Sequence, residues 1–160
     1  MSTEQMQNTN MDGQENAAPE ADMSMERYLT FRSDGTTMGV STDYVIEILT
    51  DQMITEIPMV PNFIKGIINM RGQIVPIIDM RLKMGKFADS TDTTCIIVLE
   101  IDSTCVGIQV DGVEQVLDID KTQISPIPVE DQQGLVDGMI SLSSQEVLLF
   151  LNCQELIRTY

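Results

Sequence analysis

The chain has no histidine and no tryptophan, and aromatic residues make up only 4% of its 160 residues. Without histidine it lacks the most frequent general base and the most frequent metal ligand, and no Ser-His or Cys-His pair can form. With so few aromatic side chains, a core must be built mainly from Ile, Val, Leu and Met. Apolar residues still make up 42% of the sequence. These proportions fit a globular protein with one ordinary domain, or two very small domains sharing a core.

Positive charge is scarce, since 9 Lys and Arg residues stand against 25 Asp and Glu residues, a net charge of −16. This charge repels phosphate backbones and anionic headgroups, so we expect binding neither to nucleic acid nor to a membrane surface. No apolar run approaches the ~18 residues of a membrane-spanning helix. The N-terminal segment has neither the basic start nor the apolar run of a secretory signal. These absences favour a cytoplasmic protein.

Three cysteines, an odd number, lie in segments with strand-like patterns: Cys95, Cys105 and Cys153. If a hairpin turn is centred on residues 102–103, Cys95 pairs with Val110 and Cys105 pairs with Glu100. The sulfurs of Cys95 and Cys105 then lie roughly 16 Å apart, too far for a disulfide. We therefore expect reduced thiols that pack as small apolar side chains, as in cytoplasmic proteins.

The first 26 residues differ in composition from the rest of the chain. They contain no Ile, Val, Leu or aromatic residue, and they carry six acids and no base. Such a segment cannot bury enough apolar area to offset its ordering entropy, so we expect residues 1–26 to form a disordered acidic N-terminal tail. Residues 27–160 are then the folded domain. Subtracting the tail charge of −6 from the total of −16 leaves this domain at −10.

From residue 28 onward, short runs with a period of two alternate with turn signals. About ten short strands, spaced about 8–12 residues apart, argue for small barrels or a sandwich. A short helical turn is expected at 79–84 and a closing helix at 153–158, whereas Pro76 should lie at a sheet edge or a bulge. Residues 125–128 should form a rigid extended link. The expected strands cover residues 28–31, 38–40, 45–49, 54–57, 66–70, 73–79, 94–101, 104–110, 113–119, 136–141 and 146–151.

Motifs for catalysis are rare in this sequence. It has no phosphate-binding Gly-rich loop, no Gly-x-Ser-x-Gly and no dinucleotide-binding fingerprint. Asp118 and Asp120, two apart in a strand, would point to one face, but the other oxygen ligands of a calcium loop are missing. A solvated strand face accounts for them better than a cation site. We expect no enzyme and no cofactor, with a small hydrolase that uses a carboxylate pair as the alternative from another functional class.

Five of the nine basic residues lie between positions 63 and 86, where only one acid occurs. The polar ends of a hairpin and of a helical turn could account for the lysines. Arg71 differs, because with Gly72 it occupies the tip of a predicted hairpin over residues 66–79 whose arms are almost wholly apolar. A guanidinium group there can bind a carboxylate or a backbone carbonyl of a partner. Alternatively, Arg71 folds back onto an acid such as Glu47 and locks the hairpin to its own body.

One segment is distinctive: Phe63-Ile-Lys-Gly-Ile-Ile-Asn-Met-Arg-Gly-Gln-Ile-Val-Pro-Ile-Ile-Asp-Met-Arg81. It closely resembles the signature of the CheW family, the coupling proteins of bacterial chemotaxis. The similarity extends to residues 44–48, 106–113 and 147–156. The resemblance implies a mainly all-β fold of two small five-stranded SH3-like β-barrels that share a core, with short helical turns, a short C-terminal helix and a groove between the barrels. It also implies a non-enzymatic scaffold that couples methyl-accepting chemoreceptors to the histidine kinase CheA.

The resemblance assigns partner-binding positions residue by residue. Glu47 matches an acid near the partner surfaces, and Cys95 falls where the family usually has an aliphatic residue. A receptor helix would lie in the groove, and Gly66 and Gly107, which have no side chains, would let it approach the backbone closely. The kinase surface is expected on the first barrel, spread over apolar strand residues. The receptor-groove and partner-binding positions are Val45, Glu47, Gly66, Arg71, Gly72, Cys95, Gly107 and Val116.

The resemblance also sets expectations for partners and location. The partners would be CheA, through its CheW-like regulatory domain, and the cytoplasmic tips of the chemoreceptors, with the protein itself monomeric when alone. It would be cytoplasmic and associated with receptor arrays through these partners. A chain of 160 residues has no room for a kinase or a receiver domain, which favours a stand-alone adaptor. The alternative within the same fold is a coupling protein of another receptor-kinase pathway, such as one for surface motility or development. The acidic tail is longer than the family requires, and the chain ends at Tyr160 soon after the closing helix begins.

Overall fold

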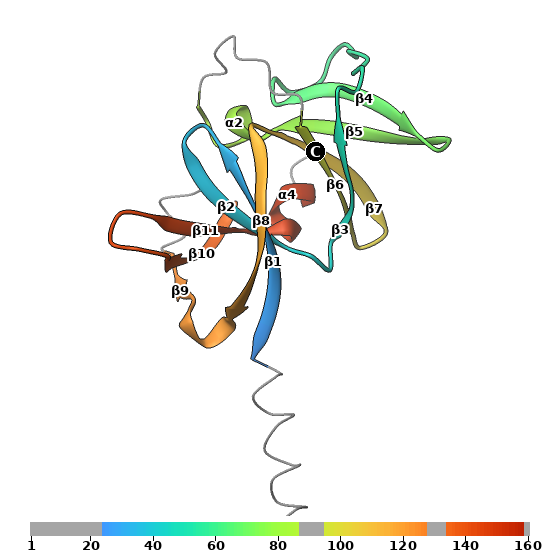
Figure 1. The fold of residues 1–160 in the computed structure, drawn as a ribbon. Helices are drawn as coiled ribbons and strands as arrows, with labels where there is room; N and C mark the ends of the chain where they lie inside the picture. Colours follow the sequence, from blue (N-terminus) through green and yellow to red (C-terminus); the bar gives the residue numbers. More distant parts are fainter. Residues whose placement is uncertain (1–23, 87–94, 128–133, 159–160) are drawn as a thin grey trace, which may run out of the picture.

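The computed structural model describes residues 24–86, 95–127 and 134–158. These residues form two β-sheets with a few short helices (Figure 1). None of the helices in these ranges is long and apolar enough to cross a membrane. The elements are β1 (Met25–Ser33), β2 (Thr36–Ser41), β3 (Val45–Thr50), β4 (Ile64–Met70), β5 (Gln73–Asp79), α2 (Met80–Lys83), β6 (Cys95–Ile101), β7 (Thr104–Val110), β8 (Gly112–Asp120), the 3₁₀ turn η1 (Lys121–Gln123), β9 (Ser125–Pro126), β10 (Val136–Ser141), β11 (Val147–Leu151) and α4 (Cys153–Arg158).

The first sheet has six strands in the order β8-β1-β2-β11-β10-β9. All its ladders are antiparallel except the one between β2 and β11, which is parallel. Five strands were expected here, and the sixth is the two-residue β9. Its Ser125 and Pro126 were predicted to belong to an unpaired link, but they lie opposite Met139 and Gly138 of β10. Proline is tolerated there because β9 is an edge strand.

The second sheet has five strands in the order β3-β6-β7-β5-β4, and all of them are consecutive in the chain. The edge strands are β3 and β4, and the segment that connects them in the chain also pairs with β4, because Thr55 and Ile67 exchange two backbone hydrogen bonds of 2.9 Å. The prediction of a strand at 54–57 was wrong, since Thr55 alone pairs.

The hairpin between β6 and β7 has the register expected from the sequence. Asp102 and Ser103 form its turn with φ angles of 50° and 67°, the two positive values that a two-residue type I′ turn requires. Cys95 lies opposite Val110 and Cys105 opposite Glu100, so the prediction is confirmed. All three cysteines are free thiols.

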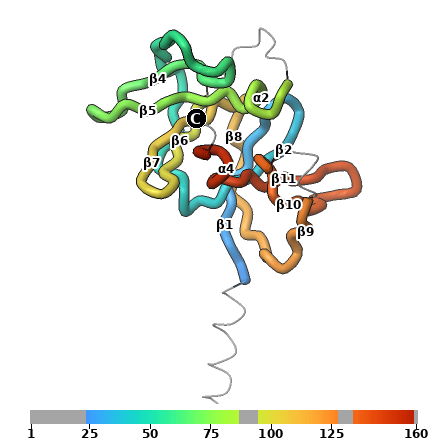
Figure 2. Tube along the Cα trace, turned by 180° about the vertical axis from the view of Figure 1, so that it is seen from behind, coloured from blue at the N-terminus to red at the C-terminus, as the bar shows by residue number. Residues whose placement is uncertain are grey.

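A shared core lies between the two sheets. The central cluster takes buried side chains from β1 and β2 of the first sheet, from β5, β6 and β7 of the second, and from α4. Each sheet also has a smaller cluster of its own, which we call the second-sheet cluster (Ile68, Val75, Ile77, Ile96 and Val98) and the first-sheet cluster (Ile119, Leu148 and Phe150). The view from behind shows α4 among the strands where the two halves meet (Figure 2). The expectation of two strand units that share one core is confirmed.

The short helix α2 follows the β4–β5 hairpin where the sequence predicts a helical turn. Asp79 caps it by accepting a hydrogen bond from the Arg81 backbone N–H, and Gly85 ends it with a φ of 79°. The side chains of Asp79 and Arg81 are both buried and form an ion pair of 3.3 Å. Pro76 pairs with β4 alone, because the parallel ladder to β7 begins one residue later. It therefore has the edge-like position expected of proline.

The strand β1 begins two residues inside the segment predicted to be a tail. Met25 and Glu26 pair with Asp120 and Ile119 of β8, so the backbone groups of these two residues have partners that composition could not reveal. The predicted boundary at residue 26 is therefore two residues too late. The rest of the predicted tail, residues 1–23, lies outside the described residues.

Candidate functional site

The tip of the β4–β5 hairpin presents Arg71, a predicted partner-binding residue whose side chain is exposed and forms an ion pair. Arg71 and Gly72 have φ angles of 54° and 84°, and the Asn69 side chain accepts a hydrogen bond from the Gly72 backbone N–H. At this turn 78% of the surface of the Arg71 side chain is exposed. No atom lies within 4 Å of the position a Gly72 Cβ would take, so the tip is open.

Arg71 also contacts its own body. Its Nη2 atom donates a hydrogen bond of 3.0 Å to Oε1 of Glu47, whose side chain is 27% exposed. This ion pair connects the hairpin to β3, the opposite edge strand of the second sheet. Oε2 of Glu47 is buried without a hydrogen-bond partner among the described residues. The contact with Glu47 is the one that the alternative expectation for Arg71 named, and the binding of Arg71 to a partner stays a prediction.

A β-bulge separates the orientations of Val45 and Glu47. Val45 lies opposite Leu99, a member of the central cluster, whereas Glu47 lies opposite Val98, a member of the second-sheet cluster. Paired residues on antiparallel strands share a face of the sheet. Val45, expected in the receptor groove, and Glu47, expected near the partner surfaces, therefore point to opposite faces of β3.

Cys95 lies within the shared core, whereas Val116 is half exposed. Cys95 is only 8% exposed within the central cluster, and its burial raises the pKa of the thiol although Val113 of β8 supplies a backbone hydrogen bond. Val116 lies opposite Leu29, another member of that cluster, but is itself 50% exposed. Val45 is partly buried and packs against the same cluster.

The two strand glycines have a role that differs from the one expected. A Cβ on Gly107 would lie 2.6 Å from Cδ1 of Ile77, inside the second-sheet cluster. A Cβ on Gly66 would collide with the backbone carbonyl of Thr55, and its φ of 150° disfavours any other residue. Both glycines make room for this chain's own packing. The expectation that their missing side chains admit a receptor helix is therefore corrected.

Exposed apolar side chains gather around the second sheet, which sequence reasoning missed. Of the ten large hydrophobic residues that are exposed among the described ones, six lie on β3, β5 or the β3–β4 connection. The sequence of β3 could have revealed this surface, because apolar residues occupy both faces of the strand and only one face can be buried in the core. These six are Ile46, Ile48, Met53, Met59, Val60 and Ile74.

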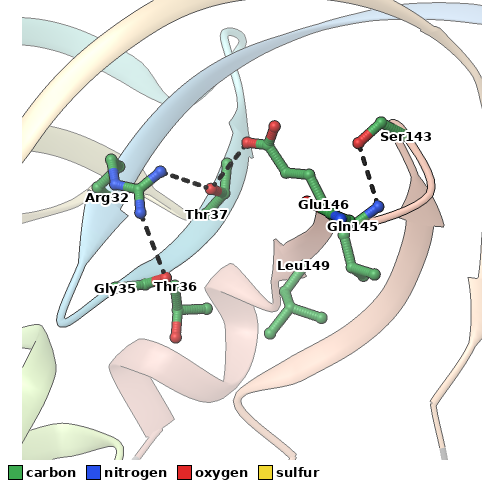
Figure 3. A pocket seen from close by; sticks show the side chains of 9 residues that line it. Arg32, Gly35, Thr36, Thr37, Ser143, Gln145, Glu146 and Leu149 are labelled. Carbon is green, nitrogen blue, oxygen red and sulfur yellow. Dashed lines mark hydrogen bonds between the residues drawn. The ribbon is translucent and has the colours of Figure 1, made fainter.

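A cavity of about 560 Å³ lies at the other end of the molecule, between the β1–β2 and β10–β11 turns (Figure 3). Its polar groups bond to one another: Arg32 donates to the Thr37 hydroxyl and the Gly35 carbonyl, and Thr37 donates to Glu146. It contains none of the eight predicted positions. The groove between the sheets therefore stays a prediction about partner binding, and this cavity offers no substitute for it.

The fold and the candidate site together define an interaction module. Within the described ranges no three metal-ligating side chains come together. Its most distinctive surface is instead an exposed arginine at a hairpin tip, on a sheet with many exposed apolar residues. Such features are typical of a protein that docks onto other proteins.

Comparisons with known proteins identify the family. The model of the CheW-like domain matches residues 27–160. The chemotaxis protein CheW of Klebsiella aerogenes is 41% identical over 104 residues, which are 64% of this chain and 63% of that protein. The CheW of Rhizobium meliloti is 28% identical over 84% of this chain and 89% of that protein. The crystal structure of the scaffolding protein TtCheW from Thermoanaerobacter tengcongensis superposes with a TM-score of 0.73 at 30% identity, covering 79% of this chain and 88% of that one. The chain belongs to the CheW-like family of chemotaxis coupling adaptors.

Proposed function

We propose that this protein links the cytoplasmic tips of methyl-accepting chemoreceptors to the histidine kinase CheA, through the kinase's CheW-like regulatory domain. It acts without catalysis and without a cofactor, by holding receptor and kinase together so that receptor state controls autophosphorylation. The observation that carries the proposal is the exposed Arg71 at the tip of the hairpin that bears the family signature. The relatives named chemotaxis protein CheW favour this pathway over surface motility or development.

The proposed partner site consists of the eight positions assigned from the sequence. A receptor helix would pack against the apolar side chains of the partly buried Val45 and the half-exposed Val116, whereas Cys95, 8% exposed, would support the site from within the shared core. Arg71 and Glu47 would exchange their internal ion pair for contacts with a partner, since the rest of the guanidinium group is free to solvent. Gly66 and Gly107 contribute indirectly, because they fix the path of the strands that shape the site.

The location follows from the partners. The protein would be cytoplasmic and join receptor arrays at the inner face of the membrane only through receptor and kinase. Its acidic charge of −16 opposes direct attachment to anionic headgroups. Alone, it would be a monomer.

The test is co-sedimentation of the full chain with receptor signalling fragments and CheA, with ATP turnover by the kinase measured in the same samples. We expect the protein to enter the complexes and to make kinase activity depend on receptor. If it neither joins the complexes nor changes ATP turnover, the proposal is wrong. Turnover of generic ester, phosphate or glycoside substrates that is lost on an acid-to-amide change would instead support the hydrolase alternative.

A further inference from the structure

A second cavity, of about 240 Å³, opens where the start of β1, the turn before β3, the strands β10 and β11 and the start of α4 meet. It contains none of the eight positions assigned to partner binding. Its walls combine aromatic rings, two carboxylates, a hydroxyl and a thiol, which none of the functions discussed above uses. The lining residues that matter are Glu26, Tyr28, Tyr44, Asp137, Phe150 and Cys153.

Aromatic residues are concentrated at this cavity. The whole chain has only three tyrosines and four phenylalanines, yet Tyr28, Tyr44 and Phe150 all line it. The rings of Tyr28 and Phe150 pack edge to face, with centroids 4.7 Å apart and an interplanar angle of 67°. Aromatic faces carry partial negative charge and attract organic cations. Phe150 is buried in the first-sheet cluster, whereas the rings of Tyr28 and Tyr44 are partly exposed and can present a surface to a ligand.

Glu26 is held in place at one wall. Its two carboxylate oxygens accept hydrogen bonds from the Tyr28 hydroxyl at 3.0 Å and from the Ser41 hydroxyl at 2.9 Å. The ammonium group of Lys121 lies 3.7 Å from the carboxylate and offsets part of its charge. Glu26 therefore fixes the orientation of the Tyr28 ring and adds a partly compensated negative charge.

Asp137 supplies the uncompensated charge. The register of β10 and β11 passes from Val136 to Gly138, so Asp137 is the extra residue of a β-bulge. A bulge turns the side chain of its extra residue out of the normal alternation, a device often found beside binding sites. Within the described ranges the Asp137 carboxylate has no ion-pair partner, although Tyr28 and Cys153 are near enough to feel its charge.

Two pKa shifts agree with this arrangement. Asp137 lies at the mouth and is exposed, but the surrounding walls desolvate its carboxyl group enough to raise its pKa. Burial, and then the charge of Asp137, raise the pKa of Cys153 to about 12, so its thiol is neutral and serves as wall. The positive charge of a bound cation would stabilise the charged carboxylate and so lower the pKa of Asp137 again.

We propose that this cavity binds an organic ammonium group, held between the partly exposed Tyr28 and Tyr44 rings and the Asp137 carboxylate, with the buried Phe150 ring packed against Tyr28. The two sources of such a group are a free alkyl or quaternary amine and a lysine side chain of another polypeptide. A metal ion is a poorer occupant, because three metal-ligating side chains do not come together in the described ranges. An anion is excluded by two carboxylates facing the same space.

The experiment titrates the full chain with choline and with n-butylammonium while the aromatic side-chain resonances are followed by NMR. We expect saturable shifts of Tyr and Phe signals with both cations, in the millimolar range. Neopentylcarbinol, the uncharged carbon isostere of choline, should bind more weakly by a factor of roughly 2 to 30. Absence of shifts with both cations, or equal binding of the isostere, would overturn the proposal.

Two variants locate the site. Asp137→Asn should weaken choline binding about tenfold or more, because it removes a charged contact. Asp51→Asn makes the same charge change at an exposed residue of the β3–β4 connection and should leave binding unchanged. Equal effects of the two variants would mean that the cations respond only to the overall negative charge. Tyr44→Leu should also weaken binding, and a thermal melt shows that each variant is folded.

The capped amino acid N-acetyl-lysine methylamide separates the two sources of ammonium. If it binds as well as n-butylammonium, the cavity accepts a side chain of a polypeptide. If only the free amines bind, the occupant is a small molecule. Both results support an ammonium site, and neither requires receptor or kinase, so this test is independent of the proposed adaptor function.

Discussion

Replacing Arg71 by alanine separates partner binding from internal stability. The folded protein loses one ion pair of 3.0 Å, in which the Arg71 side chain is 78% exposed. Solvent screens such a pair, so the loss of stability should be only about 0.5 kcal/mol, which corresponds to a change in Tm of about 2 °C. A contact between the same guanidinium group and a partner is desolvated on binding. Its loss should weaken receptor-dependent assembly roughly 10- to 150-fold.

The assay pairs a thermal melt with co-sedimentation of receptor fragments and CheA. Arg27→Ala is a matched control, because Arg27 is 67% exposed and pairs with Asp118 at 3.2 Å on the other sheet. We expect both variants to melt alike and only Arg71→Ala to lose coupling. Arg71→Lys should recover coupling in part, since an ammonium group cannot reproduce the two-pronged geometry of a guanidinium group.

The result that refutes this reasoning concerns Glu47. If Arg71→Ala and Glu47→Gln both lower the Tm by many degrees, and coupling falls only as far as the folded fraction does, the ion pair is structural. In that case Arg71 locks the hairpin to β3 and has no direct contact with a partner.

Three further predictions use other parts of the structure. Deleting residues 1–23 should leave the thermal midpoint nearly unchanged, because their composition offers almost no apolar burial; a drop of several degrees would show that they dock on the folded body. Gly66→Ala should lower the free energy of unfolding, measured by urea titration, by more than about 2 kcal/mol, because the new Cβ meets the Thr55 carbonyl at an unfavourable φ. In the control variant Gly35→Ala the new Cβ meets nothing within 4 Å, so only the φ of 77° should cost stability, about 1 kcal/mol. Iodoacetamide at pH 8 should label the partly exposed Cys105 first and the buried Cys153 only on unfolding, since burial raises the pKa of the latter to about 12; mass spectrometry that finds Cys153 labelled first in the folded protein would contradict this.

The hairpins could be predicted from the sequence because their information is local. Turn residues that accept positive φ fix the loop, the loop fixes the register, and the register fixes which side chains share a face. This reasoning placed Cys95 opposite Val110 and Arg71 at an exposed tip, as the structure confirms. The turn at 79–84 and the closing helix are also local, because Asp79 caps the first and the Asn152 side chain accepts a hydrogen bond from the Glu155 backbone N–H of the second.

Features that depend on distant segments could not be predicted in this way. A period of two shows that a strand has two faces but not which sheet it joins, so the parallel ladder between β2 and β11 left no signal. The bulge at Asp137 and the crossing of Thr55 over Gly66 are set by neighbours far along the chain. The pairing of Arg71 with Glu47 stayed one of two alternatives, because only tertiary structure decides which acid is within reach.

The order of the strands has a consequence for how this molecule forms. The second sheet is a continuous stretch of chain, residues 45–110, inserted between β2 and β8 of the first sheet, whose own ladder joins Leu29 to Val116. The first sheet therefore cannot close until the insertion has brought its two ends together, and pairing over so long a loop slows folding. The chain leaves the first sheet at Ser41, level with Leu117 of β8, and returns at Gly112, level with Arg32 at the other end of β1, so the insertion spans the length of this ladder. The inserted sheet is a contiguous cassette, which can diverge in sequence and partner preference while the strands that frame it keep their connections.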